Sequence, residues 1–388
     1  MKFLIKFFKW FAIILVSIIV LMYIFNVDYL LRAVRTIYFK GYTTAFLEDY
    51  KEFPNREIKK GIAQPWAIAS DYNSVPATQN LQNTHKELQT IAYLIIKNDS
   101  IWHESYFDGF DKNSKTNSFS MAKSVVTMAM GKAIMEGKMK SLDQKVTDFF
   151  PELKGKYAKE VTIGDLSSMA SGLSWDEKYY SPFSIVTRAY FDDNLKDVIL
   201  GLDIKEKPGQ SFKYLSGATQ LLAMCIEKAT GEYLSDYVSK HFWQPMGAEN
   251  EALWQLDEAP DGIEKAYCCI ASNARDFARF GKLYLNNGMW NGQQLLDSTF
   301  IKKCITPRFE KSPEYGYGWW MHEIKGKKLF YMRGHLGQFV IVIPEDDLII
   351  VRLGHLKGLQ TKTDPHSNDL YIYVEEAYNM LAQRDKKK

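Results

Sequence analysis

The chain has 388 residues, of which 46% are hydrophobic and 24% are charged, a balance that is typical of globular proteins and excludes a mainly disordered or collagen-like chain. The formal net charge is only +3, and no stripe of Lys and Arg marks one element, so we expect no nucleic-acid partner. A chain of this length favours a fold with two structural lobes.

An uncharged apolar segment covers residues 10–25. A membrane-spanning helix needs roughly 20 apolar residues, so this segment favours an uncleaved anchor. A cleaved signal peptide is the alternative, but such a peptide ends at small residues, whereas this segment ends in Tyr-Ile-Phe. Lys and Arg lie on both sides, so the positive-inside rule does not orient the segment. We predict an N-terminal membrane anchor at residues 1–30, followed by a stalk and linker at 31–87.

Strand-like runs lie near both ends of the remaining chain. A hairpin is predicted at 91–107, where two β-type runs flank the turn Lys97-Asn98-Asp99-Ser100. Further strand-like runs lie at 317–323, 328–333, 338–343 and 348–354. Amphipathic patterns predict helices at 218–230, 232–243, 273–287 and 368–383.

This order of elements predicts an α/β (α+β) fold class. We expect a mostly antiparallel central sheet that is built from both ends of the catalytic region and flanked by helices. An inserted all-helical lobe is predicted at about residues 124–300.

Ser120-Met121-Ala122-Lys123 is the first motif that can carry chemistry. Residues three apart share one face of a helix, so the Ser120 hydroxyl and the Lys123 amine can meet. A serine hydroxyl is a weak nucleophile that needs an adjacent base. A buried lysine can supply that base, because burial favours the neutral amine. An exposed helical lysine is the alternative. Ser118 is predicted to cap this helix.

Lys213-Tyr214-Leu215-Ser216 follows a Pro-Gly turn at 208–209. A phenol near a cationic lysine loses its proton more readily and can pass it to a leaving group. Tyr214 is therefore a candidate proton donor. A packed loop tyrosine is the alternative.

Residues 333–338 (RGHLGQ) precede the strand-like run FVIVIP. Glycines beside a buried strand permit a ligand to approach the backbone closely. Backbone N–H groups at this point can hold an oxyanion, and Arg333 and His335 can meet a carboxylate or a carbonyl. A hairpin turn with a surface histidine is the alternative.

The four cysteines are Cys225, Cys268, Cys269 and Cys304. No Cys-x-x-Cys pair occurs, so we expect no zinc or redox motif. The cysteines are predicted to be buried and structural. The adjacent Cys268 and Cys269 have poor geometry for bridging each other, although an exported domain would permit a disulfide.

The three motifs stand in the order and rough spacing of the serine β-lactamase and penicillin-binding-protein superfamily. The chain most resembles its class C-type branch, which also holds esterases, D-aminopeptidases and 6-aminohexanoate-oligomer hydrolases. Further matching phrases are MASGLSW at 169–175, YGYGWW at 315–320 and the Gly-Gln pair before the strand that ends at Pro344. The resemblance covers about residues 88–385, which we predict to be a β-lactamase-like serine hydrolase domain.

The resemblance implies a role for each matched residue. Ser120 would be the acylated nucleophile, Lys123 its base, and Tyr214 the group that relays the proton to the leaving group. The backbone N–H groups of Ser120 and Gln338 would form the oxyanion hole. Since active domains of this superfamily are usually exported, the resemblance also implies a single-pass protein of the cell membrane with an extracytoplasmic catalytic domain.

Two departures from the family pattern bear on the substrate. The family's Tyr-x-Asn is Tyr-Leu-Ser, so Ser216 replaces an amide, and Lys-Thr-Gly is His-Leu-Gly, so a hydroxyl is lost at Leu336. The predicted substrate-binding residues are Ser216, Arg333, His335 and Gly337. Because the lost groups commonly help to bind the carboxylate of β-lactams and peptides, we expect an ester or small amide substrate.

The predicted function is that of a serine hydrolase that forms an acyl-enzyme with a small-molecule or short-peptide substrate. A non-hydrolytic or slowly deacylating sensor of the penicillin-binding type, on the same fold, is the alternative. An α/β-hydrolase is disfavoured because Gly-x-Ser-x-Gly does not occur. A zinc peptidase is disfavoured because His-Glu-x-x-His does not occur. No metal or organic cofactor is expected, and the sequence does not indicate an oligomeric state.

Overall fold

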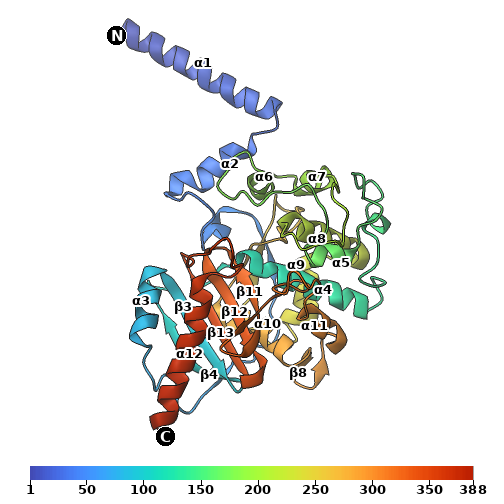
Figure 1. Ribbon diagram of the computed structural model, residues 1–388. Coiled ribbons are helices and arrows are strands. Elements are labelled where there is room, and N and C mark those ends of the chain that lie inside the picture. The colour runs from blue at the N-terminus through green and yellow to red at the C-terminus, as the bar shows by residue number, and fades with distance from the viewer. Residues whose placement is uncertain (388) are drawn as a thin grey trace.

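A computed structural model describes residues 1–387 (Figure 1). Its main element is a seven-stranded sheet in the order β10-β11-β12-β13-β3-β4-β2. These strands are β2 (Ala67–Ile68), β3 (Thr90–Lys97), β4 (Ser100–Tyr106), β10 (Trp320–Ile324), β11 (Lys327–Gly334), β12 (Gln338–Ile343) and β13 (Leu348–Gly354). Neighbours pair antiparallel except β2, which runs parallel to β4. The sheet thus unites both ends of the catalytic region, as predicted.

Local sequence accounts for most strand boundaries. The β3–β4 hairpin turns at Asn98 and Asp99, whose φ angles of 49° and 62° lie in the left-handed region that Asn and Asp tolerate. Strands β12 and β13 have the predicted bounds. Strand β10 begins three residues later than the predicted 317, because Gly318, at φ 75°, turns the chain first.

Helices cover both faces of this sheet. Helices α12 (Asn368–Lys387) and α3 (Gln79–Glu87) lie on one face, and α10 (Ala274–Leu285) lies on the other (Figure 1). A Cβ atom at Gly281 of α10 would lie 3.0 Å from Val340 Cγ1 and from Val342 Cγ2, so a glycine permits this close packing. Because both faces are covered, β12 and β13 are mostly apolar, with Gln338 and Arg352 as their buried polar exceptions.

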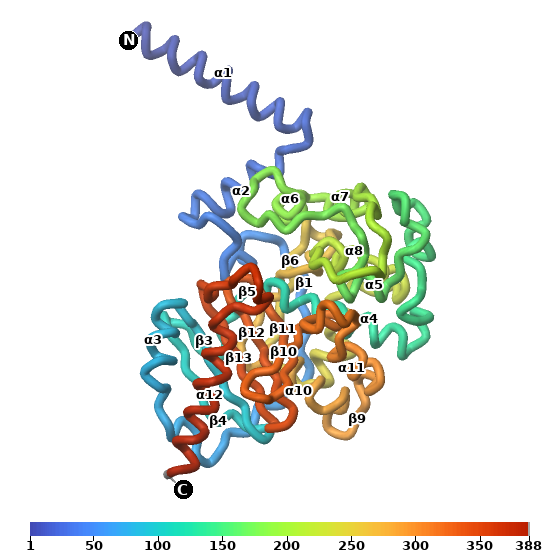
Figure 2. Tube along the Cα trace, in the orientation of Figure 1, coloured from blue at the N-terminus to red at the C-terminus, as the bar shows by residue number. Residues whose placement is uncertain are grey.

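A helical lobe lies beside the sheet (Figure 2). Its helices are α5 (Ile163–Ser167), α6 (Ile185–Phe191), α7 (Leu195–Leu200), α8 (Ser216–Thr230) and α9 (Leu234–Val238). Helix α4 (Ala122–Met135) packs against α8, and the turn before it lies against β11. Helix α9 is shorter than the predicted 232–243, because the chain continues as a π-helical turn at Ser239–Trp243. One further helix, α11 (Ser298–Cys304), precedes β10 in the chain.

A second sheet has four short strands in the order β1-β6-β7-β5. They are β1 (Asn55–Ile58), β5 (Thr116–Asn117), β6 (Ala252–Gln255) and β7 (Ile270–Ser272), and a separate hairpin joins β8 (Met289–Trp290) to β9 (Gln293–Gln294). The interval 124–300 therefore holds short strands among its helices. Strand β1 comes from the segment predicted as a stalk. Its pairing with β6 ties that segment into the catalytic region.

Helix α1 (Lys2–Ile24) projects away from the rest of the molecule, and none of its residues is buried (Figures 1 and 2). By length and composition, this helix could cross a membrane. Helix α2 (Tyr29–Thr36) follows and packs against α6 of the helical lobe. The end of α1 that leads into the domain is therefore close to that lobe.

Candidate active site

Ser120 lies in a 3₁₀ turn, η3 (Phe119–Met121), that leads directly into α4. The preceding residue, Phe119, has a φ of 46°, which is uncommon for a bulky side chain. Its N–H donates to Asn117 Oδ1 at 2.8 Å, which stabilises this conformation. The prediction that Ser118 caps the helix is wrong, since Ser118 Oγ instead accepts from the N–H of Ile270 at 3.2 Å. A local hydrogen bond with Asn117 and a long-range one with Ile270 therefore hold the turn that carries Ser120.

Lys123 lies one helical turn after Ser120, and its side chain is buried. Its Nζ is 2.9 Å from Ser120 Oγ and donates to the Tyr267 carbonyl at 2.7 Å. Burial lowers the pKa of Lys123 to about 7, although the charge of Glu177 opposes this shift. A substantial fraction of the amine is thus neutral at pH 7 and can accept the Ser120 proton.

Tyr214 lies just before α8 and faces the same two residues. Its ring is 5.1 Å from Lys123 Nζ, and it stacks on Trp320 with 5.6 Å between ring centroids. Burial is the main cause that raises the pKa of Tyr214, and the charge of Glu177 raises it further. The hydrogen bond with Ser120 lowers this pKa but does not cancel the rise. The expectation that this phenol loses its proton more readily is therefore wrong, since burial outweighs any nearby cation. The phenol keeps its proton at neutral pH, which suits a proton donor and leaves Lys123 as the base.

The turn between β11 and β12 brings the third motif to Ser120. Gly334 at the end of β11 lies close to the chain before the nucleophile, since a Cβ there would be 2.2 Å from the Ser118 carbonyl oxygen. Gly334 pairs with Gln338, the first residue of β12. The Gln338 side chain points inward and donates to the carbonyls of His335 at 3.0 Å and Gly354 at 2.7 Å. The backbone at Gln338 is thus held rigidly beside the site.

His335 and Arg333 lie on the same turn, with different surroundings. His335 stacks on Tyr179 at 5.4 Å between centroids, and its Nε2 is buried without a hydrogen-bond partner among the described residues. Burial lowers the pKa of His335 to about 4, helped by Lys357, so the ring is neutral at pH 7. The Arg333 guanidinium lies 3.8 Å from the Trp320 ring centroid and donates to the Pro365 carbonyl at 2.6 Å. His335 therefore offers an unpaired ring nitrogen and Arg333 a fixed charge.

Glu177 is a site residue that the sequence motifs missed. Its carboxylate accepts from the Ser216 hydroxyl at 3.1 Å and from the Ser216 N–H, and it also accepts from Trp175 Nε1 at 2.9 Å and from the Tyr179 hydroxyl. The Ser216 hydroxyl thus donates its proton to Glu177, and its oxygen keeps the capacity to accept a hydrogen bond. The only sequence signal for Glu177 is its place two residues after Trp175 at the end of the MASGLSW phrase.

Substituting Glu177 by glutamine should move the acidic limb of the pH–activity profile to lower pH. The Glu177 charge raises the pKa of Lys123, so its removal lowers that pKa and leaves the amine neutral at lower pH. Steady-state kcat/KM between pH 5 and 9 is the measurement. Glu206→Gln is a matched control, since Glu206 pairs with the exposed Lys213. A limb that stays in place or moves upward would contradict the electrostatic role of Glu177.

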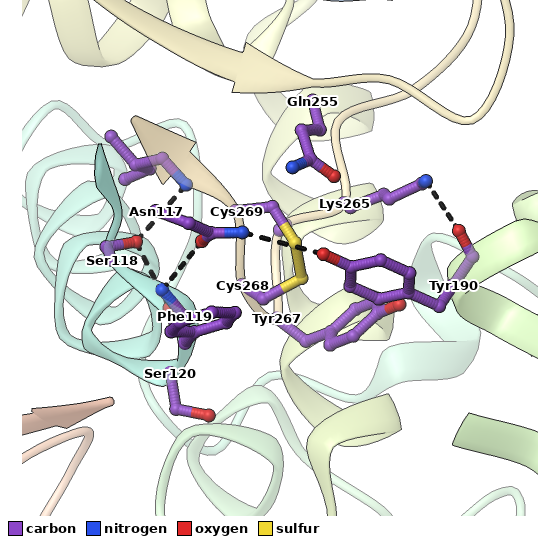
Figure 3. Close-up of a disulfide and its surroundings, with 12 residues drawn as sticks. Asn117, Ser118, Phe119, Ser120, Tyr190, Gln255, Lys265, Tyr267, Cys268 and Cys269 are labelled. Carbon is purple, nitrogen blue, oxygen red and sulfur yellow. Dashed lines mark hydrogen bonds between the residues drawn. A yellow bond between two sulfur atoms is a disulfide. The ribbon is translucent and has the colours of Figure 1, made fainter. Parts of the chain in front are cut away.

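Cys268 and Cys269 form a disulfide between adjacent residues, which overturns the expectation that they do not bridge each other (Figure 3). Cys269 accommodates the ring with a φ of 80°. The bridge directly follows Tyr267, whose carbonyl binds Lys123. Cys225 and Cys304 are free and buried. The disulfide thus lies next to the segment that positions the Lys123 amine.

Two hollows meet at Ser120. One is lined by polar and charged groups, including Tyr214, Arg333 and Lys357. The other is mostly apolar and extends towards α2 and α6, with Ser216 in its wall. Tyr179 and His335 line both. In residues 1–387, no group of three or more His, Cys, Asp or Glu side chains is arranged to hold a metal ion.

Comparison with known proteins identifies the family of this chain. The Beta-lactamase family model matches residues 77–369. A 6-aminohexanoate-dimer hydrolase from Paenarthrobacter ureafaciens is 24% identical over 312 residues, which are 73% of this chain and 79% of that protein. A proposed 6-aminohexanoate-dimer hydrolase from Bacillus anthracis superposes with a TM-score of 0.69 at 22% identity, over 87% of this chain and 92% of that one. The octameric penicillin-binding protein homologue from Pyrococcus abyssi superposes with a TM-score of 0.58 at 20% identity, over 71% of this chain and 72% of that one. The chain belongs to the Beta-lactamase family.

Proposed function

We propose that this protein is a serine hydrolase that cleaves an ester or small amide through an acyl-enzyme on Ser120. The observation that carries the proposal is the 2.9 Å contact between Ser120 Oγ and the buried Lys123 amine, whose pKa is lowered to about 7. A hydroxyl beside an amine that is partly neutral at pH 7 is the arrangement that nucleophilic catalysis needs. The names of related proteins are consistent with it, since they include a dimer hydrolase and a hydrolase with promiscuous acyltransferase activity.

The reaction would run in two stages. Lys123 takes the Ser120 proton as Oγ bonds to the acyl carbon, and the bond to the leaving group then breaks. Tyr214 protonates the leaving group and regains a proton from the Lys123 ammonium. Water then attacks the acyl carbon, releases the acid and returns a proton to Ser120. The backbone N–H groups of Ser120 and Gln338 would stabilise the oxyanion of each tetrahedral intermediate.

The polar hollow would bind the leaving-group side of the substrate, because Tyr214 lines it. Arg333 and Lys357 give this hollow a positive character. Burial lowers the pKa of Lys357, and the charge of Arg333 lowers it further. His335 is neutral at pH 7, so it can donate or accept one hydrogen bond but adds no charge. A carbonyl or a carboxylate on the leaving group would fit these partners.

The proposed location is the cell membrane, with α1 as a single anchor and the catalytic domain outside the cytoplasm. The exposed apolar surface of α1 supports an anchor. The disulfide supports an extracytoplasmic domain, because disulfides persist mainly in oxidising compartments.

Treating the full chain in detergent with a fluorophosphonate should label Ser120, as mapped by peptide mass spectrometry. Ser120→Ala should lose both the label and the turnover of a chromogenic short-chain ester. Ser124→Ala is a matched control on the same helix, where the hydroxyl bonds the Gly318 carbonyl, and it should keep the label. Labelling that survives in Ser120→Ala would refute the nucleophile. A label without turnover would favour the slowly deacylating sensor.

A further inference from the structure

The apolar hollow beside Ser120 lies on the acyl side of the site. It is lined by Ser120 and Ser216 but not by Tyr214, which lines only the polar hollow. Since Tyr214 is the proposed proton donor to the leaving group, the leaving group would occupy the polar hollow. The acyl group, on the other side of the scissile bond, would then extend into the apolar hollow.

The walls of this hollow present mostly hydrocarbon; among its lining residues, His335 Nε2 and the Tyr267 hydroxyl are buried polar atoms without a hydrogen-bond partner in the described part of the chain. Ala33, Ile37 and Val186 contribute aliphatic side chains. Several of its hydroxyls are already used within the protein: Tyr190 donates to Asp49 at 2.6 Å, and Thr187 donates to the Ser181 carbonyl at 2.8 Å. A polar substituent would find few partners there, whereas an aliphatic chain would lose no hydrogen bonds on entry.

The same hollow is built partly from the segment that follows α1. Ala33 lies in α2, and residues 43–45 close another side. Large side chains next to these elements are exposed, including Phe39 at 80%, Phe183 at 75% and Tyr180 at 71%. Tyr180 itself lines the hollow. Exposed rings beside an apolar anchor are typical of surfaces that contact the membrane interface.

We infer that the apolar hollow is an acyl-chain subsite, and that the substrate is an amphiphilic ester or amide whose unbranched aliphatic acyl chain enters it from the membrane surface. The inference rests on the proposed function, because it takes Ser120 as the acylated residue. Hydrolysis adds water across the acyl bond, so the products are a fatty acid and a polar alcohol or amine.

The test is a series of p-nitrophenyl esters from acetate to dodecanoate, each below its aggregation concentration, with the full chain in lipid nanodiscs. The expected result is a kcat/KM that rises at least tenfold from acetate to octanoate, since each buried methylene favours binding. Thr44→Trp should narrow the hollow, because Thr44 lines it and is only half-buried, so a larger side chain can be accommodated at the rim. This variant should lower kcat/KM for octanoate about tenfold and for acetate less than twofold. Ser298→Trp, an exposed position on α11, is the control and should change neither.

The outcomes separate this inference from the function on which it rests. A flat chain-length profile in the wild type, with acetate turned over and Ser120 labelled, would overturn the acyl-chain subsite alone. Equal losses for acetate and octanoate in a folded Thr44→Trp protein would also overturn it. No turnover of any ester and no label at Ser120 would overturn both. The wild-type profile tests the subsite even if Thr44→Trp does not fold.

Discussion

Replacing Lys123 by methionine should lower kcat/KM for an ester substrate by about 10²–10⁴-fold while leaving the protein folded. Methionine fills a similar volume in the buried helix but cannot accept the Ser120 proton. In the wild type, activity should fall as pH drops through about 7, because the Lys123 amine then gains a proton. The variant's residual activity should lack this limb. Lys132→Met on the same helix, where the lysine is half-buried beside Glu136, is the matched control.

Stability separates this loss of chemistry from unfolding. In the unfolded chain Lys123 would hold its proton to its ordinary pKa of 10.5, whereas in the folded protein it releases the proton near pH 7. Between these values the unfolded state binds more protons, so this residue makes the free energy of unfolding rise with pH. Below pH 7 the folded protein bears the full cost of a buried ammonium. Methionine removes that cost and loses the two hydrogen bonds of the amine, to the Tyr267 carbonyl and to Ser120 Oγ.

We therefore expect the Tm of Lys123→Met at pH 6 to equal or exceed that of the wild type, by differential scanning fluorimetry. A variant that is inactive and also markedly less stable would point to a structural role for Lys123. A variant that keeps wild-type kcat/KM would refute Lys123 as the base.

The parts of the fold that local sequence controls were predictable. The β3–β4 hairpin follows from strand patterns on either side of Asn98-Asp99, and β12 and β13 follow from apolar runs bounded by Gly and Pro. The pairing of Ser120 with Lys123 follows from helical spacing alone, and the structure places their side chains 2.9 Å apart. Motif order then predicted that Tyr214 and the 333–338 turn meet them, which they do.

Features set by contacts distant in sequence were not predictable in this way. The sequence around Ser118 is typical of a helix cap, but its hydroxyl oxygen accepts a hydrogen bond from the N–H of Ile270 in β7. Glu177 carries no motif, and only the approach of its loop to α8 brings its carboxylate to Ser216. The Cys268–Cys269 bridge depends on a left-handed backbone at Cys269, which adjacency in the sequence does not reveal.

Replacing Asp49 by alanine should cause a large loss of stability, although Asp49 lies outside the proposed catalytic residues. Asp49 is fully buried. Burial raises the pKa of its carboxyl, and this effect is larger than the opposite effect of its hydrogen bonds. Its carboxyl accepts from Asn117 Nδ2 and Gln255 Nε2, both at 2.9 Å, and from the Tyr190 hydroxyl at 2.6 Å. Alanine leaves these three donors unpaired at about 1–3 kcal/mol each, so we expect a loss of at least about 3 kcal/mol in the free energy of unfolding.

The loss should also reach the active site, because Asn117 links Asp49 to the nucleophile turn. The Asn117 Nδ2 donates to Asp49. The Asn117 Oδ1 accepts the N–H of Phe119, next to Ser120 (Figure 3). Asp49→Ala should therefore lower kcat about tenfold even at temperatures where the variant is fully folded. Glu52→Ala is the matched control in the same short helix. Glu52 forms a partly exposed pair with Lys40 at 3.0 Å, so its loss should cost less than about 1 kcal/mol. Equal Tm values for the two variants would show that the hydrogen bonds of Asp49 do not stabilise the protein. A lower Tm for Asp49→Ala together with a reduced kcat would show that the chain between the proposed anchor and the domain is part of the catalytic structure.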